Sequence, residues 1–383
     1  MILFDLIALQ PQGNVLKHGG GKYAELILQQ MLKRKLVFSA FYNSKLFLDD
    51  VLYKQLKNSN IELFDINEYP FEDILNKVPS PIVFSILPQK YMFKCKTIGT
   101  IHDCRELDLP NDWMEFLYPI SFRRILVKFF KTIFPFKHKS KILQILLDKY
   151  NDPNFIPTTI TNYTKERLST LIPNKVKNIP IFITPFDFND ISDLYSETNI
   201  VINSKYFLLV SGDRWLKNNL RAIIALDKLF TERPDLDYKV IITGLKSISL
   251  LKYPIKNKDR FECYGYVSDD ELNLLYKNAY CFIYPSLNEG FGIPPLEAMK
   301  YGTPVLASNL TAIPEVCGDS ALYFNPYSIS DLKNRILSVV ENKSIHDSCR
   351  IKGALHYEMM KARALNDMNN YIDFVISYDK GRK

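Results

Sequence analysis

Several features that would place a chain in a specialised class are missing from this sequence of 383 residues. No stretch approaches the roughly 18 to 20 uncharged apolar residues that a membrane-spanning helix needs. The cysteines form no CxxC pair, and no histidine stands at a spacing typical of metal ligands. We therefore expect free thiols in a reducing cytosol and no metal site. The six cysteines are Cys95, Cys104, Cys263, Cys281, Cys317 and Cys349.

Other signatures are missing as well. GxGxxG is absent, which argues against an ordinary dinucleotide fingerprint. We find no nucleic-acid-binding motif, internal repeat or low-complexity tract. The apolar N-terminal segment, residues 1–13, contains the charged residue Asp5 and has no basic region at its start. We therefore expect a buried first strand there rather than a signal peptide.

The composition is that of a globular protein with more than one core. Hydrophobic residues make up 47% of the chain and charged residues 24%, whereas disordered chains are less apolar. The length exceeds one ordinary core and suits two domains.

The net charge of +7 is unevenly distributed. Residues 121–150 carry eight Lys or Arg against one Asp, alternating with Phe, Ile and Leu. We favour a surface helix whose apolar side packs on its own domain. The alternative is a face, Arg123–Lys141, that rests on anionic lipid headgroups, and binding to nucleic acid ranks below both.

Short apolar runs alternate with helical patterns along most of the chain. This alternation predicts parallel sheets covered on both faces, and it starts afresh near Lys205. We therefore predict an α/β protein of two doubly wound, Rossmann-like domains, over 1–190 and 200–355, joined by a polar linker. A C-terminal helix over 356–383 is expected to cross back to the first domain. In such sheets ligands bind beyond the carboxyl ends of the strands.

The candidate site richest in glycine, proline and acidic residues is the loop "PSLNEGFGIPPLEAMKYG", which follows a predicted strand. Gly290 and Gly292 expose backbone N–H groups, and a helix opening near Pro294 adds its positive end, so the loop can seat an anion or nearby hydroxyls. Glu289 before the turn and Glu297 in the first helical turn can both point into one cavity. Carboxylates suit vicinal diols of sugars or ribose, although either glutamate alone would be explained by solvation or the helix dipole.

A second candidate is "SGDRWLKNN", where Gly212 ends a predicted strand and Arg214 and Lys217 precede a helix. Cations are slightly unfavourable at a helix start, which favours a functional role. Arg can bind a diphosphate bidentately and Lys acts as a point charge. If the pair holds a diphosphate, no metal is needed for that task, in keeping with the absence of Asp-x-Asp at the carboxyl end of a predicted strand.

Two weaker candidates lie in the first domain. Gly20 and Gly21 belong to a glycine-rich turn where backbone can approach a ligand, and His102 and Asp103 directly follow a strand. A lone histidine is more often structural than catalytic. Asn162 follows the next predicted strand, where its amide can cap a helix.

The loop with Glu289 and Glu297, extended through "TPVLASN…IPEVCGDSALYFNP", resembles the signature of the family 4 retaining glycosyltransferases of the GT-B fold. The similarity covers most of the second domain and is strongest to bacterial surface-polysaccharide enzymes, many of them mannosyltransferases. It implies two domains facing across a cleft and a nucleotide-sugar donor, GDP- or UDP-linked. Glu297 would hold the ribose and Glu289 the transferred hexose. The donor would also lie along Gly290, Phe291, Gly292 and Ile293.

The resemblance also assigns roles to the other candidates. It implies that Lys217, Arg214 and Gly212 serve the leaving diphosphate, and that His102 contacts the transferred sugar. Asp103 would face the acceptor. The family has a "GG" loop where Gly20 and Gly21 stand, and usually a serine where Asn162 stands.

The activity implied is transfer of a hexose, with mannose the sugar suggested, to a glycan or lipid-linked oligosaccharide, with the anomeric configuration retained. We expect no cofactor or metal, and a cytoplasmic enzyme, peripheral at the inner face of the cell membrane if the basic segment binds lipid. The alternatives are a GT-B nucleotide-sugar epimerase and a non-catalytic carbohydrate- or membrane-binding module.

Overall fold

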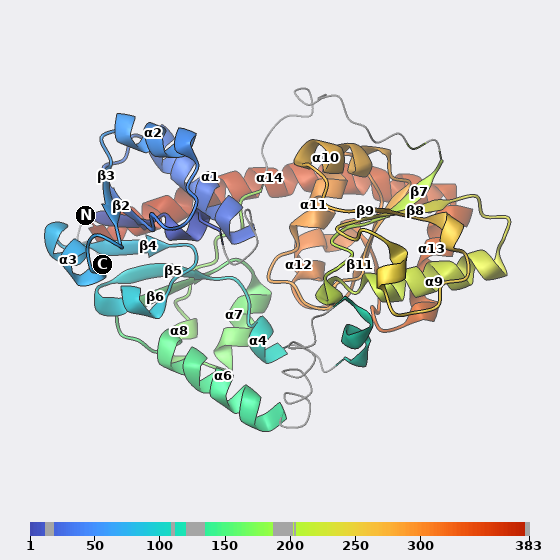
Figure 1. Ribbon diagram of the computed structural model, residues 1–383, viewed down its shortest axis with the longest axis horizontal. Helices are drawn as coiled ribbons and strands as arrows, with labels where there is room; N and C mark the ends of the chain where they lie inside the picture. The colour runs from blue at the N-terminus through green and yellow to red at the C-terminus, as the bar shows by residue number, and fades with distance from the viewer. Residues whose placement is uncertain (12–18, 109–111, 120–134, 187–201, 203, 380–383) are drawn as a thin grey trace. The chain divides into compact units, whose positions relative to one another are not determined.

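The computed structural model describes residues 1–11, 19–108, 112–119, 135–186, 202 and 204–379, which form two compact units (Figure 1). Unit 1 comprises Met1–Cys104, Lys141–Asp187 and Lys361–Lys383, and unit 2 comprises Arg105–Ser140 and Phe188–Met360. Each unit is built on a parallel sheet of six strands. The predicted α/β class with two doubly wound domains is therefore confirmed.

The sheet of unit 1 has the order β3-β2-β1-β4-β5-β6 (Figure 1). Its central strand β1 pairs with β2 and β4 and is buried along its whole length. Strands of parallel sheets are covered by helices on both faces, which is why the sequence of β1 is mostly apolar. The strands are β1 (Ile2–Asp5), β2 (Ser39–Tyr42), β3 (Glu62–Asp65), β4 (Ile82–Ser85), β5 (Thr97–Ile101) and β6 (Phe155–Thr159).

The start of helix α1 differs from the prediction. Helix α1 begins at Gly19, so the glycine-rich segment forms its first turn and not a turn before it. Glycine is tolerated at a helix start, and the buried side chains of Tyr23, Ile27 and Met31 hold the turns that follow. The helices are α1 (Gly19–Lys33), α2 (Asp50–Asn58), α3 (Phe71–Lys77), α6 (Pro135–Tyr150), α7 (Asn162–Ser169) and α8 (Pro173–Val176).

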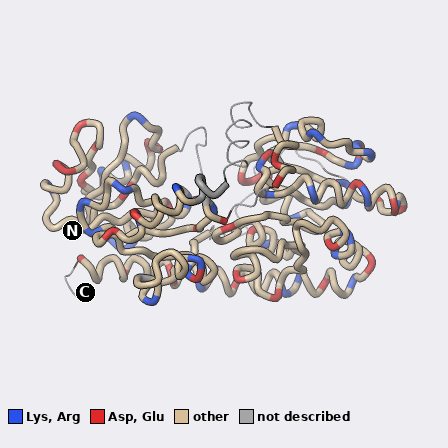
Figure 2. Tube along the Cα trace, turned by 90° about the horizontal axis from the view of Figure 1, so that it is seen from below, with Lys and Arg blue, Asp and Glu red and all other residues tan. Residues whose placement is uncertain are grey.

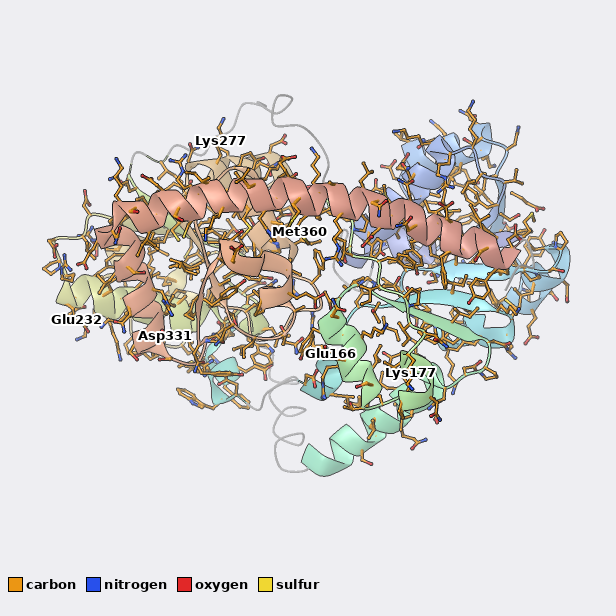
Figure 3. The ribbon with its side chains drawn as sticks, turned by 180° about the vertical axis from the view of Figure 1, so that it is seen from behind. Glu166, Lys177, Glu232, Lys277, Asp331 and Met360 are labelled. Atoms are coloured by element: carbon orange, nitrogen blue, oxygen red, sulfur yellow. The ribbon has the colours of Figure 1, made fainter. Side chains whose placement is uncertain are left out.

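The sheet of unit 2 repeats the same connectivity, in the order β12-β11-β10-β7-β8-β9. Its strands are β7 (Tyr206–Leu209), β8 (Lys239–Thr243), β9 (Phe261–Tyr264), β10 (Cys281–Tyr284), β11 (Val305–Ser308) and β12 (Leu322–Phe324). Its helices are α4 (Arg105–Asp108), α9 (Asn219–Glu232), α10 (Asp269–Asn278), α11 (Ile293–Lys300), α12 (Ile313–Cys317) and α13 (Ile329–Glu341), with the first part of α14 (Lys343–Asp379). Glu232, at the end of α9, forms an ion pair with Lys333 of α13, and both helix ends can be found in Figure 3 from the labels Glu232 and Asp331.

Local sequence signals mark the start of α10 and the end of α11. Ser268 caps α10 by accepting a hydrogen bond from the backbone N–H of Glu271, whose side chain bonds back to the N–H of Ser268. Gly302 lies past the end of α11 with a φ of 66°, a conformation that glycine adopts without strain.

The predicted first domain, 1–190, differs from unit 1 because residues 105–140 group with unit 2. Two contacts explain this. The guanidinium of Arg221 in α9 binds the carboxylate of Asp112 through two hydrogen bonds of 2.6 and 3.0 Å. The hydroxyl of Tyr118 accepts a 2.8 Å bond from the N–H of Leu220 at the start of the same helix.

The long helix α14 (Lys343–Asp379) starts before the predicted boundary at residue 356 and contributes to both units. His356, Tyr357 and Met360 are buried in its unit 2 part (Met360 is labelled in Figure 3). In unit 1 the hydroxyl of Tyr371 lies 2.9 Å from the Oγ1 of Thr100 and accepts a 2.8 Å bond from Thr158.

The described part of the chain contains no helix long and apolar enough to cross a membrane. Basic and acidic residues are interspersed over each unit (Figure 2). Most of the basic segment Arg123–Lys141, for which contact with lipid is the alternative interpretation, lies outside the described residues.

Candidate functional site at the centre of the second sheet

The predicted site residues of unit 2 surround the point where the strand order of its sheet reverses. Strands β7 and β10 pair at the middle of the sheet, and the chain continues to β8 on one side and to β11 on the other. Doubly wound sheets bind ligands at the carboxyl ends of such a strand pair. The loop with Gly212, Arg214 and Lys217 follows β7, and the loop with Glu289 follows β10.

The structure joins these two loops through a buried ion pair. The ammonium of Lys217 donates to Oε1 of Glu289 at 2.8 Å and to the hydroxyl of Tyr284, the last residue of β10, at 2.9 Å. The two charged side chains are 10% and 12% exposed. Charges taken out of water this far need a partner, so the pair fixes the β7 loop against the β10 loop.

The ionisation of this pair follows from its surroundings. Burial by itself raises the pKa of Glu289, but the charge and hydrogen bond of Lys217, the hydrogen bond of Ser286 and the charge of Arg105 outweigh it and hold the pKa at about 2. Burial lowers the pKa of the Lys217 ammonium, and the charges of Arg214 and Arg105 act in the same direction, against the pull of Glu289. Glu289 therefore carries its negative charge at neutral pH.

The backbone around the pair is held in unusual conformations. Ser211, Asn218 and Thr311 have φ angles of 55°, 57° and 57°, which are uncommon for residues other than glycine and most of all for a β-branched residue. The Oγ1 of Thr311 accepts a bond from the backbone N–H of Glu289 at 3.1 Å. Asn218 donates to the carbonyl oxygens of Pro285 and Pro326. Backbone strain of this kind accumulates at functional sites.

The second glutamate lies one helix turn further than predicted. Helix α11 begins at Ile293 and has no acidic residue in its first turn, so Glu297 does not stand where the helix dipole would favour it. Its Oε2 accepts a 3.1 Å hydrogen bond from the hydroxyl of Tyr276 on α10. Gly292 caps α11 with a φ of 102°, and its neighbours Gly290 and Phe291 are buried.

Arg214 and Gly212 have different surroundings. Arg214 is exposed and precedes a short 3-10 turn, Trp215–Lys217, that separates it from α9. Gly212 is buried, and a Cβ atom there would stand 2.6 Å from Cγ2 of Ile242 and 2.8 Å from Cβ of Leu245. Gly212 thus allows the β7 loop to pack on the end of β8, while Arg214 is open to a ligand.

In unit 1, His102 follows β5 as predicted. Its Nε2 lies 2.9 Å from the carbonyl oxygen of Ile86, and its ring packs edge-on against Tyr23 of α1. A carbonyl can only accept, so Nε2 carries the proton. Asp103 is half-buried beside it, and Gly20 packs against Leu87 at the end of β4. Gly21, also in α1, is buried.

Helix α7 is capped by Thr161, whose Oγ1 accepts from the N–H of Thr164 at 3.2 Å. Asn162, whose amide could have capped a helix, is already the first residue of α7.

The six cysteines are free thiols. Among the described residues, no group of three or more His, Cys, Asp or Glu side chains is placed to hold a metal ion.

Several residues of the site were not predicted. Tyr284 and Ser286 stand inside the conspicuous loop motif, but nothing in the sequence indicates that they bind Lys217 and Glu289. Thr311 and Tyr276 lie 22 and 21 residues from the glutamates they contact. The charge of Arg105, three residues after His102, reaches Glu289, and no local pattern signals it.

Comparison with known proteins identifies the region around this site. A family model described as glycosyl transferases group 1 matches residues 192–356. This segment contains both loops, both glutamates and the strands β7 to β12.

Curated relatives carry mannosyltransferase names. The O-antigen chain mannosyltransferase RfbU of Salmonella typhimurium is 31% identical over 231 residues, which is 59% of this chain and 56% of that protein. The O-antigen chain mannosyltransferase B of Escherichia coli is 32% identical over 152 residues, 38% of this chain and 40% of that protein. The matched part thus spans about half the length of these relatives or less.

Solved structures match nearly the whole chain in fold. A glycosyltransferase from Rickettsia africae has a TM-score of 0.65 at 15% identity, covering 98% of this chain and 97% of that one. WaaG, a glycosyltransferase involved in lipopolysaccharide biosynthesis, has a TM-score of 0.64 at 12% identity, covering 98% and 99%. At such identities the likeness concerns the fold, and the predicted GT-B architecture is confirmed. The chain has the GT-B fold, and its residues 192–356 match the model of the glycosyl transferases group 1 family.

Proposed function

We propose that this protein is a retaining glycosyltransferase that moves a hexose, mannose, from a nucleoside-diphosphate sugar to a hydroxyl of a glycan or lipid-linked oligosaccharide in polysaccharide biosynthesis. The observation that carries the proposal is the buried Lys217–Glu289 pair at the reversal point of a group 1 domain. The mannosyltransferase names of the relatives support the choice of sugar.

In this proposal the donor diphosphate is bound by cations of the β7 loop. Lys217 uses two of its three N–H donors on Tyr284 and Glu289, which leaves one for a phosphate oxygen. Arg214 is exposed and can bind bidentately. Together with the N-terminus of α11, these groups stabilise the negative charge of the leaving nucleoside diphosphate.

The remaining roles follow from the same scheme. Glu297, oriented by Tyr276, binds the ribose, and Glu289 binds the hexose. His102 contacts the transferred sugar, and Asp103 faces the acceptor. The leaving phosphate accepts the proton of the acceptor hydroxyl on the same face of the sugar, so the configuration is retained without a metal. Contact of Arg123–Lys141 with an anionic membrane remains a prediction.

A thermal-shift panel without metal tests the donor site. It contains GDP-mannose, UDP-glucose, UDP-GlcNAc, UDP-galactose, ADP-glucose and the free diphosphates. Because a ligand that binds only the folded state stabilises it by about 2.7 kcal/mol at a hundred times its Kd, we expect compounds of one nucleotide to raise the Tm. A folded protein that responds to none of them would contradict the proposal.

Whether the reaction requires an acceptor distinguishes a glycosyltransferase from a nucleotide-sugar epimerase. With the stabilising donor and a glycan acceptor, we expect a lengthened glycan and one nucleoside diphosphate per transfer. An epimerase would change the sugar without any acceptor.

A further inference from the structure

Helix α14 carries a row of large apolar side chains that its own unit leaves exposed. Ile351, Leu355 and Met359 are 63%, 69% and 58% exposed, and Figure 3 views unit 2 from the side of this helix. The opposite face is buried through Tyr357 and Met360. A single exposed apolar residue is normal, but three on successive turns of one helix face form a patch that is typical of an interaction site.

The exposed row follows an 11-residue repeat. Its successive members are three or four positions apart, and every one of them is exposed. The row, which we call the α14 stripe, consists of Ser344, Ser348, Ile351, Leu355, Met359, Ala362 and Asn366. Because eleven residues make almost exactly three helical turns, a row of this period stays on one side of the helix. The stripe is roughly 33 Å long at 1.5 Å per residue, which is long enough for a second helix to lie along it.

Charges of opposite sign border the stripe. At 100° per residue, Glu358 lies about 60° to one side of Leu355 and Lys352 about 60° to the other. Eleven positions away the same signs recur, with Asp347 on the acidic side and Arg363 on the basic side. A helix that rests on an anionic membrane would be basic on both sides of its apolar face. The mixed border therefore favours another helix as the occupant.

We propose that the α14 stripe is the interface of a homodimer in which the two copies of α14 lie parallel to each other. Around a two-fold axis along the helices, the acidic border of each copy faces the basic border of the other. In an antiparallel pair each border would face its own copy, and like charges would meet. Only the parallel arrangement is therefore complementary in charge.

The spacing of the border charges agrees with this arrangement. Asp347 precedes Lys352 by five positions, and Glu358 precedes Arg363 by five. Five positions separate the g residue of one heptad from the e residue of the next, and these are the residues that form ion pairs between helices of a parallel coiled coil. Two-fold symmetry then gives four ion pairs, two from each acidic residue.

Sedimentation velocity of the full chain, from about 1 to 100 μM, tests the dimer. One helix face is smaller than a standard interface, so we expect a Kd in the micromolar range. Leu355→Glu places two carboxylates against each other in the middle of the stripe and should raise the Kd roughly a hundredfold. Val51→Glu is the matched control, because Val51 is an apolar residue of α2 with 75% exposure, and its Kd should equal that of the unaltered chain.

A charge exchange tests the parallel arrangement. Glu358→Arg alone turns two attractive contacts into repulsive ones and should raise the Kd about tenfold. Combining it with Arg363→Glu restores opposite charges across the interface and should return the Kd to its original value. Residues five apart on one helix are not neighbours on its surface, so the recovery has to come from the second copy. Equal Tm values would show that all variants are folded.

Four results would overturn the proposal. The first is a chain that stays monomeric at 100 μM, and the second is a dimer that Leu355→Glu leaves intact. The third is a monomer that binds phosphatidylglycerol vesicles through Leu355, since lipid would then cover the stripe. The fourth is a double variant no tighter than Glu358→Arg, which would exclude the parallel pair. None of these results bears on the proposed transferase activity, because the variants lie outside the donor loops.

Discussion

Two buried carboxylates show how partners decide the charge of a residue. Glu289 in unit 2 faces an ammonium and a hydroxyl, and its pKa falls to about 2 despite burial. Asp5, at the end of β1 in unit 1, is 1% exposed and receives bonds from the Oγ of Ser85 and the N–H of Ile7. Burial dominates there and raises its pKa to about 7. Among the described residues, no cation lowers the pKa of Asp5 as Lys217 lowers that of Glu289.

This difference predicts opposite pH effects on stability. Glu289 has a pKa of about 2 in the folded chain and 4.5 in the unfolded chain. Its ionised form therefore stabilises the fold above pH 4.5, and this stabilisation is lost as the pH falls to about 2. For Asp5 the folded chain holds a proton between the unfolded pKa of 3.8 and about 7. The folded state then binds more protons than the unfolded state, so the free energy of unfolding falls as the pH rises.

We expect Asp5→Asn to remove this pH dependence, since the amide stays neutral and can still accept from the N–H of Ile7. Between pH 5 and pH 8 the free energy of unfolding of the unaltered chain should fall by about 2 to 3 kcal/mol relative to that of the variant. Urea unfolding of both proteins at the two pH values measures it. A stability difference that stays constant with pH would show that Asp5 titrates normally.

At the scale of elements, one ion pair ties the segment before residue 120 to helix α9. Asp112 and Arg221 form a bidentate pair with side-chain exposures of 5% and 11%. Removing one partner of a buried pair leaves the other charge uncompensated, which costs far more than the pair contributes as a whole.

We expect Asp112→Ala to lower the free energy of unfolding of unit 2 by about 3 to 5 kcal/mol. Asp235→Ala is the control, because its partner Arg233 lies at the surface and exposed pairs contribute little. Denaturant unfolding of both variants gives the comparison. Equal effects in the two variants would mean that solvent screens the Asp112–Arg221 pair.

At the scale of the whole molecule, each unit is assembled from segments distant in sequence. Unit 1 includes the end of α14, where Tyr371 lies within hydrogen-bonding distance of the hydroxyls of Thr100 in β5 and Thr158 in β6. The side chain of Asp367 accepts from the N–H of Ile183 in the same unit. The last helix is therefore part of the core of unit 1.

We expect Tyr371→Phe to destabilise unit 1 by about 1 to 3 kcal/mol, because the buried hydroxyls of Thr100 and Thr158 lose a partner. Tyr378→Phe, on the same helix and half-buried, is the matched control with little expected change. Denaturant unfolding followed by a probe in unit 1 measures both. Equal stabilities of the two variants would mean that the hydroxyl of Tyr371 contributes nothing to docking the helix.

Much of this architecture was predictable because its signals are local. The apolar runs of β1, β7 and β10 lie where the alternation predicts strands, and Ser268 marks the start of α10 through contacts three residues away. Other elements have no such local signal. A three-residue strand such as β12 carries too little periodicity to be recognised, and it forms because β11 is there to pair with it.

The α/β class, two doubly wound domains and the loops that carry Glu289 and Lys217 could be predicted from the sequence, because hydrophobic periodicity and turn chemistry act over a few residues. Which side chains meet depends instead on how the chain folds over long separations. Lys217 lies 72 residues from Glu289 and Asp112 lies 109 from Arg221, and no local pattern encodes such separations. Burial then set the charges, since the pKa of a carboxylate depends on partners that folding alone brings to it.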